Sequence, residues 1–259
     1  MLPRAKCFEK CSVAVHISKS CPQVKISDCE VKTFVDCCSG VKFLGLKMLP
    51  AGVHYVHYST VGSNNDVSPR RGFFISVDPG EVIVHRFDVE REEIVNDVTE
   101  EEVERFKSNL KNIDSHLGAY PHKLWSKWVS LSNRISSTSL DKYQQFENSE
   151  STFAKYDFTE VPKQKYPDGS SASEISLHNL DSSHQLQVFL QGEESVEEVL
   201  VQLQMAFILF LVGQDYESFN QWKVVVDMMC GCGNALVKYP NLFKRFINDL
   251  HFQVLVIKN

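Results

Sequence analysis

Short runs in which apolar and polar residues alternate begin near residue 41 and predict strands. Four extended segments can be recognised, at residues 41–50, 53–60, 72–77 and 81–87. The turn sequences Pro50-Ala51-Gly52 and Asp78-Pro79-Gly80 follow the first and the third of them. We therefore expect four strands that form an antiparallel sheet.

The last of these segments has a clear two-residue period. Because successive side chains of a strand point to opposite faces, Val82, Val84 and Arg86 are expected on one face. The residues expected on the opposite face are Ile83, His85 and Phe87.

A helical period replaces this alternation after residue 98. Thr99 and Glu102 have the spacing of a capping box, so a helix is expected to begin there and to end at Gly118. Its apolar stripe consists of Val103, Phe106, Leu110, Ile113 and Leu117. Pro121 suits the first turn of a second helix, whose stripe consists of Leu124, Trp128, Leu131 and Ile135. Residues 156–159 are read as one further strand.

Residues 163–192 are rich in Pro, Gly and Ser and are predicted to link two domains. Helices are expected at 193–212, ended by Gly213, at 216–229, and from Pro240 onward. The predicted class is α+β: an atypical arm at 1–33, a β-rich domain with flanking helices at 34–162, and an all-α domain at 193–259. Because the last helix ends on apolar residues without a cap, we expect the helical domain to continue beyond Asn259.

Charge and hydropathy exclude several classes of protein. The 259 residues carry 27 Lys and Arg against 33 Asp and Glu, a net charge of −6, which argues against binding nucleic acid through phosphate contacts. The longest apolar run, at 205–212, is too short to cross a membrane, and no secretory signal opens the chain. We expect neither membrane nor nucleic-acid binding.

The cysteines do not form a recognisable metal or redox motif. Six of the eight lie before residue 39, with irregular gaps and no C-x-x-C pair, and Cys230 and Cys232 are one residue apart. We expect free thiols; a zinc site on the N-terminal cysteines is the alternative.

No catalytic motif is present in the sequence. His54 and His57 are three residues apart on a predicted strand, so their side chains should not share a metal ion. The acidic run at 88–104 is expected to be a solvated face, or otherwise a protein-binding one. Trp125 and Trp128 are expected in the core or against a protein partner rather than on bases. We therefore predict no catalytic or metal-binding residue, no cofactor and no small-molecule substrate.

Several blocks of sequence occur together in the order found in a known family. They are KFLGLKMLPAGVHYVHYS, RRGFF with EVIVHRFD, LGAYP with KLWSKWVSLSNRIS, DFTEVPKQKYPDGSSASEIS, LQMAFILFLVGQDYESFNQWKVVVDMMC and YPNLFKRFINDLHFQ. Over residues 40–253 the chain resembles the Aar-two family, the cistron-splicing factors that assist assembly of the U-five small nuclear ribonucleoprotein.

The resemblance implies a role without catalysis. Family members bind the RNase-H-like and Jab/MPN-like domains of the spliceosomal scaffold Prp-eight, keep an RNA helicase off until maturation, and are released by phosphorylation. It also implies a VHS-like helical domain and a location in cytoplasm and nucleus. A hydrolase or zinc-dependent enzyme whose site converges only in three dimensions is the alternative.

The signature positions of the family are expected to be structural, since glycines and prolines suit turns and aromatic residues suit core stripes. In this chain they are Gly45, Lys47, Pro50, Gly52, His54, Tyr120, Pro121, Trp128, Tyr166, Pro167, Gly213 and Trp222. We offer the linker serines Ser170, Ser171 and Ser173 as phosphorylation sites, because added negative charge there would oppose docking.

Overall fold

The computed structural model describes residues 44–59, 68–88, 90–148, 150–193 and 195–258, and the backbone of 12–17. The chain divides into two compact units. The first comprises residues 1–128 and 136–156, and the second comprises 129–135 and 157–259. Apart from the backbone of 12–17, the expected arm at 1–33 and the six N-terminal cysteines lie outside the described residues.

A five-stranded mixed sheet is the centre of the first unit, in the order β6-β5-β1-β2-β7. Its strands are β1 (Ser12–Ile17), β2 (Gly45–Leu49), β5 (Val82–Asp88), β6 (Glu93–Val95) and β7 (Leu117–Ala119). The central strand β1 pairs antiparallel with β2 and parallel with β5, and β2 pairs parallel with β7. Strand β6 closes the opposite edge, antiparallel to β5.

Strands β3 (Gly52–Tyr58) and β4 (Arg71–Val77) form a separate antiparallel pair, in register from Gly52 opposite Val77 to Tyr58 opposite Arg71. A second small pair joins β8 (Gln144–Phe146) to β9 (Ala154–Tyr156). Strand β9 overlaps the expected 156–159 segment by one residue.

The prediction of one four-stranded antiparallel sheet is wrong. The turn at Pro50 connects β2 of the large sheet to β3 of the small one, and the turn at Asp78 connects β4 back to β5. Each short turn therefore moves the chain between sheets. The strand β1, which the sequence pattern did not identify clearly, takes the place between β2 and β5.

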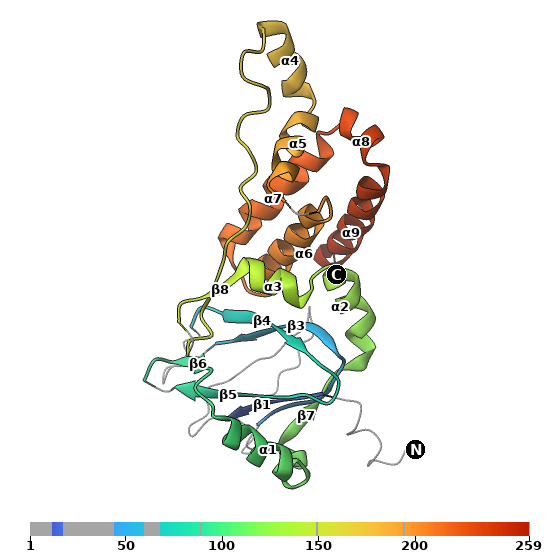
Figure 1. The fold of residues 1–259 in the computed structure, drawn as a ribbon. Coiled ribbons are helices and arrows are strands. Elements are labelled where there is room, and N and C mark those ends of the chain that lie inside the picture. Colours follow the sequence, from blue (N-terminus) through green and yellow to red (C-terminus); the bar gives the residue numbers. More distant parts are fainter. Residues whose placement is uncertain are drawn as a thin grey trace. The chain divides into compact units, whose positions relative to one another are not determined.

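The two faces of β5 explain the layers of this unit. Val82 and Val84 pack with the apolar stripe of α1 (Glu100–Ile113), whereas Ile83 and Phe87 pack with the β3–β4 pair. The expected alternation is thus confirmed, and the large sheet lies between α1 and the small sheet (Figure 1). Arg86, on the α1 side, forms an ion pair with Glu102 of that helix at 2.9 Å.

Helix α1 begins as predicted but ends earlier. The hydroxyl of Thr99 accepts a hydrogen bond from the backbone N–H of Glu102, and the Glu102 carboxylate reaches back to Thr99, which completes the capping box. The helix ends at Ile113, before a short 3₁₀ turn, η3 (Asp114–His116). Gly118 therefore lies within strand β7 and does not end the helix.

Pro121 precedes a 3₁₀ turn, η4 (His122–Leu124), and not the first turn of an α-helix. Helix α2 (Trp125–Ser132) follows directly, and α3 (Ser137–Tyr143) comes before β8. Of the predicted stripe, Trp128, Leu131 and Ile135 are buried.

Residues 157–259 form the helical unit together with 129–135. Its helices are α4 (Ala172–Leu180), α5 (Ser183–Gln191), α6 (Glu198–Leu211), α7 (Tyr216–Cys230), α8 (Asn234–Lys238) and α9 (Pro240–Lys258). The prediction that 163–192 is a linker is wrong for most of its length, since it contains α4 and α5. The segment contains two helices of nine residues each, and the side chain of Ser171 caps the first of them.

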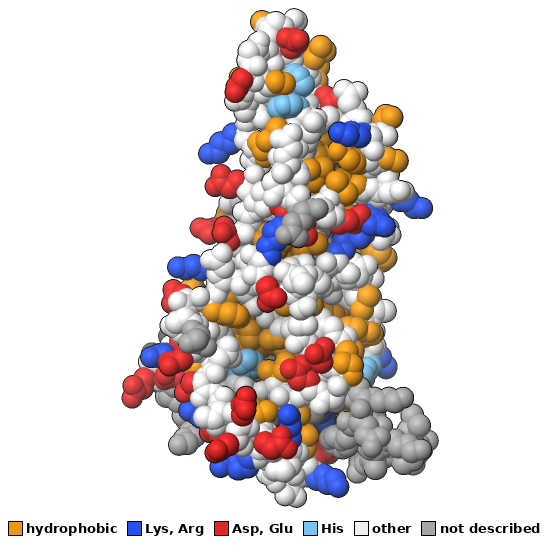
Figure 2. Space-filling model, in the orientation of Figure 1, with side chains coloured by type: hydrophobic (Ala, Val, Ile, Leu, Met, Phe, Trp, Pro, Cys, Tyr) orange, Lys and Arg blue, Asp and Glu red, His pale blue; other side chains and the backbone are white. Residues whose placement is uncertain are grey.

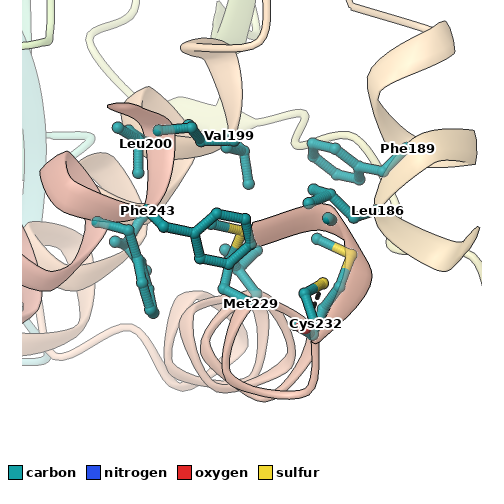
Figure 3. Packing of buried hydrophobic residues seen from close by; sticks show 13 residues of the cluster. Leu186, Phe189, Val199, Leu200, Met229, Cys232 and Phe243 are labelled. Atoms are coloured by element: carbon teal, nitrogen blue, oxygen red, sulfur yellow. Dashed lines mark hydrogen bonds between the residues drawn. The ribbon is translucent and has the colours of Figure 1, made fainter. Parts of the chain in front are cut away.

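The core of the helical unit draws side chains from α5, α6, α7 and α9. Leu186 and Phe189 of α5 point toward Val199 and Leu200 of α6 and toward Met229 and Phe243 (Figure 3). All but two of the residues from Val199 to Leu211 are buried, which explains why this stretch is apolar apart from Gln202 and Gln204. The α+β class with a helical second half is confirmed, and within the described residues no helix is both long and apolar enough to span a membrane.

Candidate functional site

The N-terminal signature positions gather where β2 meets the end of α1. The ammonium of Lys47 donates hydrogen bonds to the backbone carbonyl of Asp114 at 3.0 Å and to its carboxylate at 2.6 Å. The backbone N–H of Tyr120 in turn donates to the carbonyl of Lys47. Lys47 therefore fastens the η3 turn to β2, which is a structural task.

His54 lies at the centre of an aromatic cluster beside this turn. Its imidazole is 2% exposed, and its ring centroid is 5.5 Å from those of Tyr120 and Trp125. One ring nitrogen, Nε2, lies 2.8 Å from the carbonyl oxygen of Pro50. The indole Nε1 of Trp128 donates to the carbonyl of Val53 at 2.7 Å. These contacts hold the turn between β2 and β3 in place.

Gly52 lets the chain pass this cluster. Its backbone φ is +133°, a value that residues other than glycine rarely adopt. A Cβ added to Gly52 would lie 3.6 Å from the Trp125 ring. Pro50 and Gly52 lie in the turn between β2 and β3.

The C-terminal signature positions serve the packing of the helical unit. Trp222 of α7 donates its indole N–H to the amide oxygen of Gln253 at 2.8 Å and lies against Phe207 and Phe219. Gly213 follows α6, but the left-handed residue at this helix end is Gln214, with a φ of 60°. The carbonyls of Tyr166 and Pro167 accept hydrogen bonds that fold the segment before α4.

The three predicted phosphorylation sites lie at the start of α4, not in an irregular linker. The hydroxyl of Ser171 caps this helix in a capping box with Glu174. Ser170 donates to the carbonyl of Pro167 at 2.7 Å, and the hydroxyl of Ser173 lies 3.1 Å from that of Ser171. Ser171 and Ser173 are exposed.

An ion-pair network around the buried carboxylate of Asp249 in the helical unit was not predicted. Arg134 donates to the carboxylate of Asp249 at 2.5 Å and lies 3.5 Å from Glu197, which also pairs with Arg245. Asp249 is 1% exposed, and this burial raises the pKa of its carboxyl group although Arg134 lowers it. The signal in the sequence was the position of Asp249 on the apolar stripe of α9.

Two buried amide side chains of α6, Gln202 and Gln204, bond to neighbouring chain segments. The side chain of Gln204 accepts a hydrogen bond from the backbone N–H of Arg134 and donates to Asn133. The side chain of Gln202 accepts from the backbone N–H of Thr159 at 2.9 Å. The two polar residues that interrupt the apolar run of α6 thus bind the chain segments that pack on it.

The described residues include two thiols but no cluster of candidate metal ligands. Among them, no group of three or more His, Cys, Asp and Glu side chains is placed to hold a metal ion. Cys230 and Cys232 are free thiols. Burial raises the pKa of Cys232 to about 12, with help from the Asp181 carboxylate, so this thiol stays protonated near neutral pH.

Comparison with known proteins covers both units. The family described as AAR2 N-terminal domain matches residues 17–145, and that described as AAR2 C-terminal repeat region matches 158–259. The relative named Protein AAR2 homolog from Homo sapiens is 31% identical over 265 residues, covering 83% of this chain and 69% of its own length. The protein of the same name from Macaca fascicularis is 32% identical over 273 residues, covering 85% and 71%. That from Caenorhabditis elegans is 26% identical over 262 residues, covering 83% and 72%. Since the two family matches span most of the sequence in the expected order, the chain belongs to the AAR2 family.

Proposed function

We propose that this protein is an assembly factor of the splicing machinery that binds the RNase-H-like and Jab/MPN-like domains of Prp-eight during biogenesis of the U-five small nuclear ribonucleoprotein. Membership of the family supports a role in splicing and ribonucleoprotein assembly. The proposal includes a non-enzymatic mode of action and a location in both cytoplasm and nucleus.

The observation that carries the proposal is the family match of both units. Each matched region also has its own hydrophobic core, one around β3, β4 and β5 and one around α6. A chain with two separate folded surfaces can contact two partner domains at once. Linked contacts of this kind raise affinity because the second contact becomes intramolecular.

Release of the partner requires a change in the charge or shape of the surface that binds it. A phosphate on Ser171 or Ser173 would add about 1.5 to 2 negative charges at the first turn of α4. The helix dipole favours an anion there, so the helix would persist while the charge of its exposed end changed. Replacing Ser170, Ser171 and Ser173 together with Glu should weaken partner binding; replacement with Ala should leave it unchanged.

Co-purification tests the proposal in the cell. The tagged chain, expressed in its own organism, is recovered from extract and its partners are quantified by mass spectrometry. We expect enrichment of Prp-eight and other U-five proteins over an unrelated tagged protein. Recovery without any such enrichment would contradict the proposal.

A further inference from the structure

Every polar group of Thr159 is bound by a side chain from another part of the helical unit. Its backbone N–H donates to the amide oxygen of Gln202 on α6 at 2.9 Å, and its carbonyl accepts from the amide nitrogen of Gln221 on α7 at 3.1 Å. Its hydroxyl donates to the carboxylate of Glu193. Thr159 belongs to residues 158–162, which the structure describes and which lie in neither a helix nor a strand. Side chains of the helical unit therefore bind this irregular segment as they would bind a separate peptide.

The end of the segment is bound in the same manner. The amide nitrogen of Gln185 on α5 donates to the carbonyl of Pro162, and Val161 packs against the hydrophobic core of the helical unit. The four side chains that bind the segment, here called the amide site, are Gln185, Glu193, Gln202 and Gln221. With the core beside it, the amide site suits a hydroxyl residue, any residue, an aliphatic residue and a proline, in that order. Proline suits the last place because it brings no N–H that would need a partner.

The amide site is oriented by contacts that do not involve the segment. Gln202 is 0% exposed, and its amide nitrogen donates to Glu193 at 2.9 Å, which directs its oxygen toward Thr159. The helices that carry the three glutamines pack together through the core shown in Figure 3. If the segment left, buried donors and acceptors would lose their partners, so binding of a second peptide with matching chemistry would be favoured.

Residues 158–162 are anchored less firmly than the site that binds them. None of the side chains at 157–163, a stretch that the structure describes in full, is buried, and Asp157, Glu160 and Lys163 are exposed. Figure 2 shows acidic and basic side chains along the surface of the stretch that leads to α4. Segments with few buried apolar contacts open at a lower free energy than the core does. We therefore expect the segment to leave the site before the helical unit unfolds.

We propose that the amide site binds a segment of a partner protein with the pattern Ser or Thr, any residue, an aliphatic residue and Pro, and that residues 158–162 occupy this site as an internal competitor. Because these residues are tethered to the site, their effective concentration there is high, and a partner segment gains access only when they open. Backbone groups paired with amides give affinity, and the Glu193 carboxylate and the core next to Val161 give specificity. The inference rests on contacts within the helical unit and does not depend on the identity of the splicing partner.

A peptide supplied in trans tests the inference on the whole chain. Two open variants are made, Thr159→Pro and Thr159→Pro with Val161→Asp, because proline removes both the N–H and the hydroxyl of residue 159. The probe is a fluorescent peptide with the sequence of residues 155–165, KYDFTEVPKQK. Measured by anisotropy, it should bind an open variant at least about tenfold more tightly than the wild type, whose site is occupied. The same peptide carrying both substitutions should bind the open variant at least about tenfold more weakly.

A further substitution locates the site. In the open variant, Gln221→Leu should weaken binding of the peptide about tenfold or more, since it removes a donor to the threonine carbonyl. Gln187→Leu, at an exposed glutamine of α5, is the matched control and should leave binding unchanged. Circular dichroism and thermal melting check that every variant is folded.

The proposal is overturned by any of the following results. A folded open variant that does not bind the peptide would show that the site accepts no segment in trans. Equal binding of the substituted peptide, or no effect of Gln221→Leu, would place the bound peptide elsewhere on the chain. Loss of folding in both open variants would show that residues 158–162 are part of the core and do not leave the site.

Discussion

The indole nitrogen of Trp128 donates a hydrogen bond of 2.7 Å to the backbone carbonyl of Val53, a residue 75 positions away. Trp128 is 1% exposed, so neither group can exchange this bond for one with water. The bond fixes α2 to the start of β3. It gives a physical reason for a Trp, and not merely a large apolar residue, at this signature position.

Replacing Trp128 with Phe should lower the free energy of unfolding by about 1–3 kcal/mol, because it removes the donor and leaves a buried carbonyl unsatisfied. Urea denaturation followed by circular dichroism measures the change. Trp125→Phe is the matched control, since no described hydrogen bond from the Trp125 indole is lost. Equal losses for both variants would show that the Trp128 bond is unimportant.

The Arg134–Asp249 pair should behave as a buried ion pair in which each charge needs the other. Arg134→Met or Asp249→Leu alone should destabilise the protein by about 3–5 kcal/mol, because one charge is left uncompensated. The double variant should recover most of that loss, since Arg245 still neutralises Glu197. A double-mutant cycle by chemical denaturation measures the coupling, and additive losses would contradict it.

His85 should make stability depend on pH. Burial lowers the pKa of its imidazole from the usual 6.5, against a raising contribution from Asn96, whose side-chain oxygen lies 2.6 Å from Nδ1. As pH falls below about 6.5, the unfolded chain takes up a proton that the folded chain does not, so stability falls. The stability that His85 contributes is complete above that pH.

The measurement for His85 is the urea midpoint at pH 7.5 and 5.5 for the wild type and for His85→Gln. The wild type should lose more stability, with a slope from this residue of at most about 1.4 kcal/mol per pH unit. Other groups titrate equally in both proteins and cancel in the comparison. Identical losses in the two proteins would mean that the imidazole is protonated freely in the folded state.

Gly72 of β4 should not tolerate a side chain. An added Cβ would lie 2.5 Å from the hydroxyl oxygen of Tyr55 and 2.7 Å from the backbone carbonyl oxygen of Val56. Gly72→Ala should therefore destabilise the protein by about 1–3 kcal/mol or more. Gly192→Ala, where the nearest atom is 3.8 Å away, is the control and should be neutral or slightly stabilising, as thermal melting can show.

Local signals in the sequence predicted local structure well. Three kinds of local signal were recognisable: the capping box at Thr99, the alternation along β5, and the apolar periods of α7 and α9. Each depends only on residues that are close together in the sequence. The signature residues Lys47, His54 and Trp128 were predicted to be structural; each of them makes a hydrogen bond or a close polar contact with the backbone of a neighbouring segment. Recognition of the family came from the order of several blocks rather than from any one motif.

Non-local relationships could not be predicted in this way. The pairing of β1 with β5 depends on contacts across about 70 positions, and no local pattern encodes which sheet a strand joins. Helix α4 has no buried residue, so it lacks the apolar stripe by which a helix is usually recognised. The Arg134–Asp249 pair joins residues 115 positions apart and becomes visible only in three dimensions.

Direct binding tests the central claim most simply. The purified chain is titrated by calorimetry with the C-terminal region of Prp-eight from the same organism, containing the RNase-H-like and Jab/MPN-like domains. Circular dichroism of both proteins checks that each is folded before mixing. We predict saturable binding of one chain per partner, with weaker binding to either domain alone. No heat of binding and no co-elution of the two folded proteins would contradict the account.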